Sequence, residues 1–316
     1  MKGSCSQPNC FFSDGGCKLG NEDLTQCDYW QGLSQTEAAP VSDTTDEPGQ
    51  GVPWTGLALG RADLVDVAMR GRPILIGIVG PADSGKTTFL VGLYLMLLQG
   101  HQLAESTFAG SLTLEAWESL AGWMRWTELG RPPTFPPHTS SRNDRQPGLL
   151  HLALRLSSGQ RRDILFTDAP GEWFTRWALK ADAPDAEGAR WVAERADGFL
   201  LFADCKRLAG PDFGAGRQDL RSVMARMGPV TGQRPVGIVW AKSDIAVKQV
   251  LVDAITKNQR QYLSDAQFYE ASIKHPEKIL HAVSATVSAA LKTVKVQPLS
   301  VPILDHRPFF AFRGPA

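Results

Sequence analysis

Gly80-Pro-Ala-Asp-Ser-Gly-Lys-Thr87 is the stretch that decides the fold of this chain. The apolar run Ile74–Val79 before it predicts a buried strand, and Thr88–Gln99 after it predicts a helix. In a glycine-rich turn between a strand and a helix, backbone N–H groups can close around an anion, and the helix N-terminus adds positive dipole character. The spacing therefore predicts a phosphate-binding P-loop, with an ordinary glycine turn as the alternative.

The side chains of this turn suit a nucleotide bound with Mg²⁺. Lys86 is expected to neutralise the β- and γ-phosphates, and the Thr87 hydroxyl is expected to bind Mg²⁺. We assign the nucleotide's phosphate cradle to Gly80, Asp83, Ser84, Gly85, Lys86, Thr87 and Thr88.

A second buried strand is predicted at Ile164–Thr167, and it ends in Asp168-Ala-Pro-Gly171. An aspartate at a strand end beside the P-loop can hold Mg²⁺ through water, so Asp168 is the second expected metal ligand. The amide of Gly171 could contact a γ-phosphate and so sense its presence. The alternative for Asp-x-x-Gly is a plain loop turn.

A third buried strand, Pro235–Trp240, leads into Ala241-Lys-Ser-Asp244. A carboxylate at Asp244 can accept two hydrogen bonds from guanine, from N1–H and from the amino group, while the stem of Lys242 can lie over the base. Adenine offers no such pair of donors, which would leave the carboxylate unpaired. The alternative is a solvated lysine and a helix-capping aspartate.

Lys278–Val283 is expected to be the last strand of the sheet. We expect Ser284 and Ala285, which follow it, to form a further base-contacting loop. The order of P-loop, Asp-x-x-Gly, Lys-x-Asp and Ser-Ala resembles a P-loop GTPase over about residues 72–295.

Apolar residues alternate at even positions from Leu150 to Leu156, and a turn at Ser157–Gln160 joins this segment to the next strand. The alternation predicts an edge strand with one buried side. A hairpin just before Asp168 resembles the translation-factor-related (TRAFAC) class of GTPases. Phe108–Leu114 and Asp168–Phe174 are similar to the second family of double-GTPase domains of bacterial conflict systems.

This resemblance implies a three-layer α/β P-loop fold whose sheet is mostly parallel with one antiparallel edge strand. It also implies a switch that binds GTP or GDP with Mg²⁺ and hydrolyses GTP slowly, with a role in a bacterial conflict or defence system. Ala241 departs from the pattern, because GTPases commonly carry Asn or Thr there to tie the base loop to the P-loop. Two alternatives stay open: a nucleotide-binding interaction scaffold with little turnover, and an ATPase or kinase on the same scaffold.

The resemblance also points to residues for hydrolysis. Glu172 stands where small GTPases place the glutamine that orients attacking water, although an acidic residue in a helix's first turn explains it equally well. Asp83 stands where some relatives carry an asparagine that binds a monovalent cation, but a turn role is the simpler interpretation.

The switch residue that would close over the γ-phosphate lies in the Pro-rich segment 131–147. Thr139 is the first choice and Thr134 the second. Arg142 and Arg145 in the same segment suit either an arginine finger in cis or solvated loop charges.

Four of the five cysteines fall within the first 27 residues, at Cys5, Cys10, Cys17 and Cys27. In a reducing compartment, four clustered thiols are more often metal ligands than disulfides, and four thiolates satisfy tetrahedral Zn²⁺. An unstructured tail and disulfides are the alternatives. We divide the chain into a cysteine-rich module (1–30), a flexible linker (31–56), the GTPase domain (57–295) and a C-terminal tail (296–316).

The whole 316-residue chain is 43% hydrophobic and has a formal net charge of zero, so nothing indicates nucleic-acid binding. No apolar run approaches the ~20 residues that cross a membrane, and we expect a cytoplasmic protein. The insert Ser111–Leu129 contains three tryptophans at near-helical spacing. Core packing is its default interpretation; this insert, the cysteine-rich module and the tail are the candidate surfaces for a protein partner.

Overall fold

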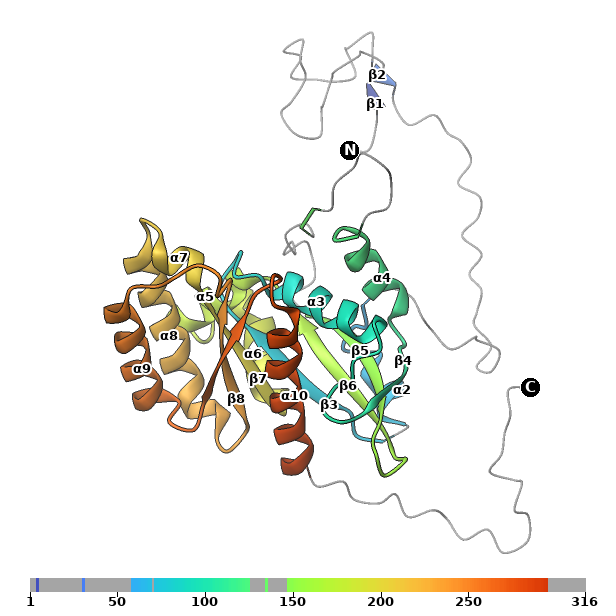
Figure 1. The fold of residues 1–316 in the computed structure, drawn as a ribbon. Helices are drawn as coiled ribbons and strands as arrows, with labels where there is room; N and C mark the ends of the chain where they lie inside the picture. The colour runs from blue at the N-terminus through green and yellow to red at the C-terminus, as the bar shows by residue number, and fades with distance from the viewer. Residues whose placement is uncertain are drawn as a thin grey trace, which may run out of the picture. The chain divides into compact units, whose positions relative to one another are not determined.

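In this computed structural model, the residues described are 4–5, 30–31, 58–69, 71–125, 134–135 and 147–294. They include a seven-stranded sheet with the order β4-β5-β6-β3-β7-β8-β9 (Figure 1). The strands are β3 (Ile74–Val79), β4 (Thr107–Gly110), β5 (Gly148–Arg155), β6 (Arg161–Asp168), β7 (Gly198–Asp204), β8 (Val236–Ala241) and β9 (Gln267–Ala271).

The sheet is mostly parallel, as expected for a P-loop fold. Neighbouring strands from β6 to β9 pair in parallel, while β5 pairs antiparallel with β6 as the first half of the predicted hairpin. The expectation that β5 is the edge strand is wrong, because β4 pairs with its other side. Both faces of β5 are covered, and His151 and Ala153 on its supposedly open face are fully buried.

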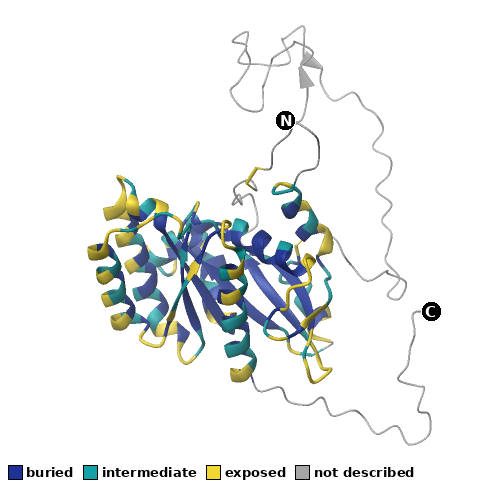
Figure 2. Cartoon of the chain, viewed as in Figure 1, coloured by how far each residue is buried: buried dark blue, intermediate teal, exposed yellow. Residues whose placement is uncertain are grey.

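Helices cover both faces of the sheet (Figure 1). One layer contains α3 (Lys86–Leu98), α4 (Leu114–Gly122) and α10 (Pro276–Thr293). The other contains α5 (Gly171–Leu179), α6 (Glu187–Arg195), α8 (Phe213–Thr231) and α9 (Gln249–Tyr262), with the 3-10 turn η2 (Pro184–Ala186) and the short α7 (Cys205–Ala209). Figure 2 shows the strands buried between these two layers, so each face of the sheet has its own core.

The predicted last strand, Lys278–Val283, is wrong because this segment lies inside α10. Its apolar residues follow helical spacing: Ile279, Ala282, Val283, Thr286, Val287 and Ala290 are buried along one side of the helix. Pro276 begins this helix at a position where proline's missing N–H costs nothing. The last strand is β9, which begins eleven residues closer to Asp244 than the predicted strand does.

Ahead of β3, the described residues 58–69 contain one short helix. Only α2 (Leu64–Ala68) is helical, and Leu59 instead forms an isolated antiparallel bridge to Leu149 of β5. In the tryptophan-rich insert, Trp117 of α4 is fully buried, which confirms core packing for that residue, whereas Trp123 is 45% exposed. Trp126 lies outside the described residues.

Near the N-terminus, β1 (Ser4–Cys5) and β2 (Trp30–Gln31) pair antiparallel and belong to a unit separate from residues 52–306. Cys10, Cys17 and Cys27 lie outside the described residues, as do the linker and the tail. Within the described ranges there is no group of three or more His, Cys, Asp or Glu side chains suited to a metal, so Zn²⁺ binding stays a prediction. No helix in those ranges has the length and apolarity to cross a membrane.

Candidate functional site

The turn between β3 and α3 has the backbone of a phosphate cradle. Gly85 has a φ of +88° immediately before α3 begins at Lys86, and this left-handed conformation favours glycine. Asp83 also has a positive φ of +57°. The buried Ser84 closes the turn by donating its hydroxyl to the Pro81 carbonyl at 2.8 Å. The turn therefore wraps the N-terminus of α3, where an anion is stabilised.

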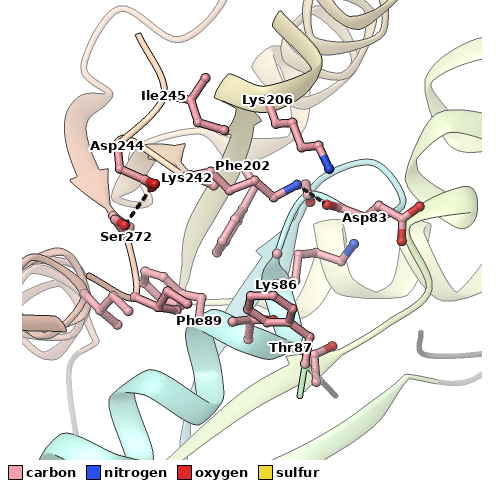
Figure 3. A pocket seen from close by; sticks show the side chains of 18 of the residues that line it. Asp83, Lys86, Thr87, Phe89, Phe202, Lys206, Lys242, Asp244, Ile245 and Ser272 are labelled. Atoms are coloured by element: carbon pink, nitrogen blue, oxygen red, sulfur yellow. Dashed lines mark hydrogen bonds between the residues drawn. The ribbon is translucent and has the colours of Figure 1, made fainter. Parts of the chain in front are cut away.

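Lys86 is held inside this turn. Its ammonium donates to the carbonyl oxygens of Pro81 at 2.8 Å and Gly80 at 3.2 Å. Burial lowers the pKa of Lys86 from 10.5 to about 8, and the nearby carboxylates of Asp168, Glu172 and Asp83 partly oppose that shift. Figure 3 shows the Lys86 side chain among the residues that line a cavity. A phosphate bound in this cradle would form a charge-assisted hydrogen bond with the Lys86 ammonium.

Thr87 and Asp168 come together at the phosphate end of the site. The Thr87 hydroxyl donates to the Asp168 carboxylate at 3.2 Å, although the two residues are 81 positions apart. A hydroxyl and a carboxylate are hard oxygen donors of the kind Mg²⁺ prefers, so the pair fits the predicted metal site. Beside this pair, a side chain replaces the backbone acceptor between β3 and β6: Ile78 donates its backbone N–H to the Thr167 hydroxyl at 2.9 Å.

Gly171 begins α5 directly against the P-loop. A Cβ atom at this position would lie 2.1 Å from the Ala82 nitrogen and 2.2 Å from the Pro81 carbonyl carbon, closer than any side chain can approach. The next residue, Glu172, lines a neighbouring cavity of about 650 Å³ together with Pro81 and Ala82. Both predicted γ-phosphate residues after Asp168 therefore adjoin the P-loop.

The base side of the site is built from the loops after β8 and β9. Asp244 accepts hydrogen bonds from the Ser272 hydroxyl and from the Lys274 ammonium, each at 2.8 Å. These bonds, that from Lys274 first, lower the pKa of Asp244 to about 2, so the carboxylate is ionised. Figure 3 shows Asp244 and Ser272 side by side at the opposite end of the site from Thr87.

Lys242 links the two sides. It has a φ of +58°, and its ammonium donates to the Asp83 carbonyl of the P-loop at 2.6 Å and to the Asp204 carboxylate at 2.8 Å. Asp204 comes from the end of β7, which lies between β3 and β8, the strands that precede Asp83 and Lys242. Three loops therefore meet at one ammonium group.

One cavity of about 470 Å³ contains both sides of the site. Gly80 is not part of its lining, but its carbonyl binds Lys86 from behind. The predicted site residues that line the cavity are Asp83, Ser84, Gly85, Lys86, Thr87, Thr88, Gly171, Lys242 and Asp244.

Ser284 and Ala285 do not line this cavity, because both lie within α10, where the Ser284 hydroxyl accepts the Ala104 N–H at 3.2 Å. Their expected place is taken by Ala271 and Ser272 at the end of β9. The aromatic pair Phe268-Tyr269 before them and Pro276 after them were the signals for this strand and for the helix that follows.

Thr139, Arg142 and Arg145 lie outside the described residues, so their roles stay predictions. Thr134, the second switch candidate, donates its N–H to the Trp123 carbonyl at 2.8 Å, and its neighbour Phe135 lines the cavity. Sequence reasoning missed this aromatic contact together with Asp204, Ser272 and Lys274, which come from separate strand ends and loops.

Comparison with known proteins agrees with the geometry. The family model described as Double-GTPase 2 matches residues 74–291, from the start of β3 to the last turn of α10. No curated protein matches the chain. The matched range contains the P-loop, the Asp168 loop and the loops that carry Asp244 and Ser272, and it confirms the resemblance inferred from the motifs.

Proposed function

Because the chain belongs to the Double-GTPase 2 family, we propose that it binds GTP with Mg²⁺, hydrolyses it slowly and acts as a molecular switch. The observation that carries the proposal is the single cavity with a P-loop at one end and the ionised Asp244 at the other. Its volume of about 470 Å³ suits one small-molecule ligand.

Asp244 is the residue that would select guanine. The N1–H and amino group of guanine present two donors to one carboxylate, and an ionised acceptor makes such bonds stronger. Ser272 already orients one of the two carboxylate oxygens. An adenine nucleotide would bring an acceptor to this point, so the charged group would lose its partners.

The phosphate end supplies the charges that GTP hydrolysis needs. Lys86 would stabilise charge on the β–γ bridge, while Thr87 and Asp168 would hold Mg²⁺. When bound, Mg²⁺ neutralises charge on the β- and γ-phosphate oxygens. The Gly171 amide would respond to the γ-phosphate, Glu172 would accept a hydrogen bond from the attacking water, and Thr139 would close the switch segment over the site.

A switch passes its state to another molecule. We propose a protein partner that binds through the cysteine-rich module, the insert 111–129 or the tail, and a role in a bacterial conflict or defence system in the cytoplasm. The resemblance supports this role, and Zn²⁺ binding by the four N-terminal cysteines belongs to the same proposal.

The decisive experiment is competition of GTP and ATP for a fluorescent guanine nucleotide in the presence of Mg²⁺. We expect clear GTP preference in the wild type and its loss in Asp244→Ala. Asp253→Ala, which removes an exposed carboxylate on α9, is the matched control and should keep the preference. Equal competition by ATP in the wild type would contradict guanine selection and leave an ATPase on the same fold.

Hydrolysis is tested separately by a single-turnover measurement, with enzyme in excess over GTP. We expect slow release of phosphate by the wild type and none above background by Lys86→Ala, which lacks the cation of the cradle. No turnover in a wild type that binds GTP would instead favour the interaction scaffold.

A further inference from the structure

Asp204 is a nearly buried carboxylate at the centre of the site. It ends β7, which lies between β3, the strand before the P-loop, and β8, the strand before the base loop. Its side chain is 8% exposed, and both oxygens are engaged. One accepts the Lys206 N–H at 3.0 Å and so caps α7, and the other accepts the Lys242 ammonium at 2.8 Å.

The Lys242 ammonium needs this partner because of where it stands. It also donates to the Asp83 carbonyl at 2.6 Å, and Figure 3 shows this bond reaching the P-loop. A neutral carbonyl offsets little of the cost of holding a cation at a partly buried position, whereas a carboxylate offsets much more. Asp204 therefore holds the Lys242 ammonium where it can reach the P-loop.

The neighbouring residues do not duplicate this link. Ala241 pairs with Asp204 across β7 and β8, but its methyl group has no hydrogen-bonding capacity. The thiol of Cys205, which follows Asp204, has its pKa raised to about 12 by burial first and by the Asp204 charge second. It stays neutral near pH 7 and supplies no competing charge. The loop after β7 and the loop after β8 are thus joined by the Asp204–Lys242 ion pair, and the same ammonium joins both to the P-loop at Asp83.

We infer that Asp204 is a positioning residue for nucleotide binding: it holds Lys242 against the P-loop, so that the lysine stem and Asp244 meet the base in register with the phosphates. The inference rests on the proposed function, since it concerns the same cavity. Asp204 is absent from the cavity lining and would act through Lys242. It would govern how long a nucleotide stays bound, with little effect on the bond-breaking step.

The test measures the dissociation rate of a fluorescent GDP from wild type, Asp204→Ala and Asp204→Asn. We expect GDP release from Asp204→Ala to be at least about tenfold faster than from wild type. A tenfold change corresponds to about 1.4 kcal/mol of binding free energy. Asp204→Asn keeps one acceptor oxygen, which can serve either the Lys206 backbone N–H or the Lys242 ammonium, but loses the charge, so its release rate should be intermediate. Guanine-over-adenine preference should fall in the same order, while the single-turnover hydrolysis rate at saturating enzyme should change less than the release rate.

Asp219→Ala is the matched control, because Asp219 pairs with Arg207 at 2.7 Å beside the same strand end and lies outside the nucleotide cavity. It should leave release and base preference within about twofold of wild type, because this partly exposed pair touches neither Lys242 nor the P-loop. A double-mutant cycle with Lys242→Met should be strongly non-additive with Asp204→Ala.

Unchanged release and base preference in Asp204→Ala would overturn the inference, as would additive effects in the cycle. If Asp204→Ala does not fold, Asp204→Asn decides, and wild-type behaviour in that variant in both release and its salt dependence overturns it. These results leave the proposed function intact when Asp244→Ala still abolishes guanine preference. A wild type without guanine-nucleotide binding overturns both proposals.

Discussion

The ammonium of Lys274 lies 2.8 Å from one carboxylate oxygen of Asp244, while the Ser272 hydroxyl occupies the other oxygen at the same distance. Guanine needs both oxygens for its two donors. The Lys274 side chain is 69% exposed, so it can leave without unfolding anything. If guanine binds at Asp244 as proposed above, the base must displace the Lys274 ammonium.

We expect Lys274→Ala to raise the association rate of GDP a few-fold at low salt, because the base no longer competes with a cation. The difference should shrink as salt screens the exposed pair. Stopped-flow association at two salt concentrations measures both effects. Lys278→Ala, which breaks another exposed pair with Glu270, is the control. Slower association or faster release in Lys274→Ala would mean that Lys274 binds the nucleotide directly.

Gly171 lies too close to the P-loop for any other residue. We expect Gly171→Ala to push the start of α5 away from Pro81 and Ala82, because the added methyl would lie within 2.2 Å of their backbone atoms. GDP binding should change by less than about tenfold, since the cradle and Asp244 are untouched, whereas single-turnover GTP hydrolysis should fall by more than that. Gly214→Ala in α8, which meets no atom within 4 Å, should alter neither measurement. Normal hydrolysis in Gly171→Ala would contradict a role for this contact in switching.

The insert helix α4 depends on Trp117. This side chain is fully buried, stacks on Tyr94 with ring centroids 5.3 Å apart, and donates its indole N–H to the His151 carbonyl at 2.9 Å. We expect Trp117→Ala to lower the free energy of unfolding by about 3–5 kcal/mol. Trp123→Ala, at a 45% exposed position, should cost about 0.5 kcal/mol or less. Chemical denaturation of the variants measures both, and equal costs would contradict the core assignment.

Local sequence was sufficient to predict the parts of the site in which a buried strand leads directly into a turn with functional side chains. The P-loop, Asp168 and Asp244 were all predicted because each follows a short apolar run, and the carboxyl ends of parallel strands meet at one edge of the sheet. The same logic failed at residues 278–283. A six-residue segment with four apolar residues does not separate a buried strand from a buried helix face, and only the continuation of the pattern to Ala290 does.

Other parts of the site depend on tertiary contacts that no single segment encodes. Asp204 ends the buried strand β7, but the function inferred for it depends on Lys242, which lies 38 residues later. Likewise, the alternation from Leu150 to Leu156 predicted an edge strand with one open face, whereas β4 pairs with the outer edge of β5, and His151 and Ala153 on that face are buried. His151 fills that face by accepting the Leu112 N–H at Nδ1 and approaching Asp163 at 3.0 Å through Nε2.

The last prediction concerns protons and Lys86. Burial lowers the Lys86 pKa from its ordinary value of 10.5 to about 8 in the folded chain. Below about pH 8 both states carry the proton, and the folded state bears the full cost of a buried charge. Between these two pKa values the unfolded chain binds more protons, so the contribution of Lys86 to the free energy of unfolding rises with pH.

Nucleotide binding should show the opposite trend, because phosphate oxygens favour the charged ammonium and raise its pKa. We expect GDP affinity to fall as pH rises above about 8. At a pH between the Lys86 pKa of the free protein and its higher pKa in the complex, binding should take up a proton. Calorimetric titration in two buffers of different ionisation enthalpy measures this uptake directly. Lys86→Met should abolish it together with most of the affinity, whereas Lys278→Ala should keep both. Proton uptake that persists in Lys86→Met would assign the titration to another group. It would contradict a lowered pKa of the buried Lys86 ammonium as the cause.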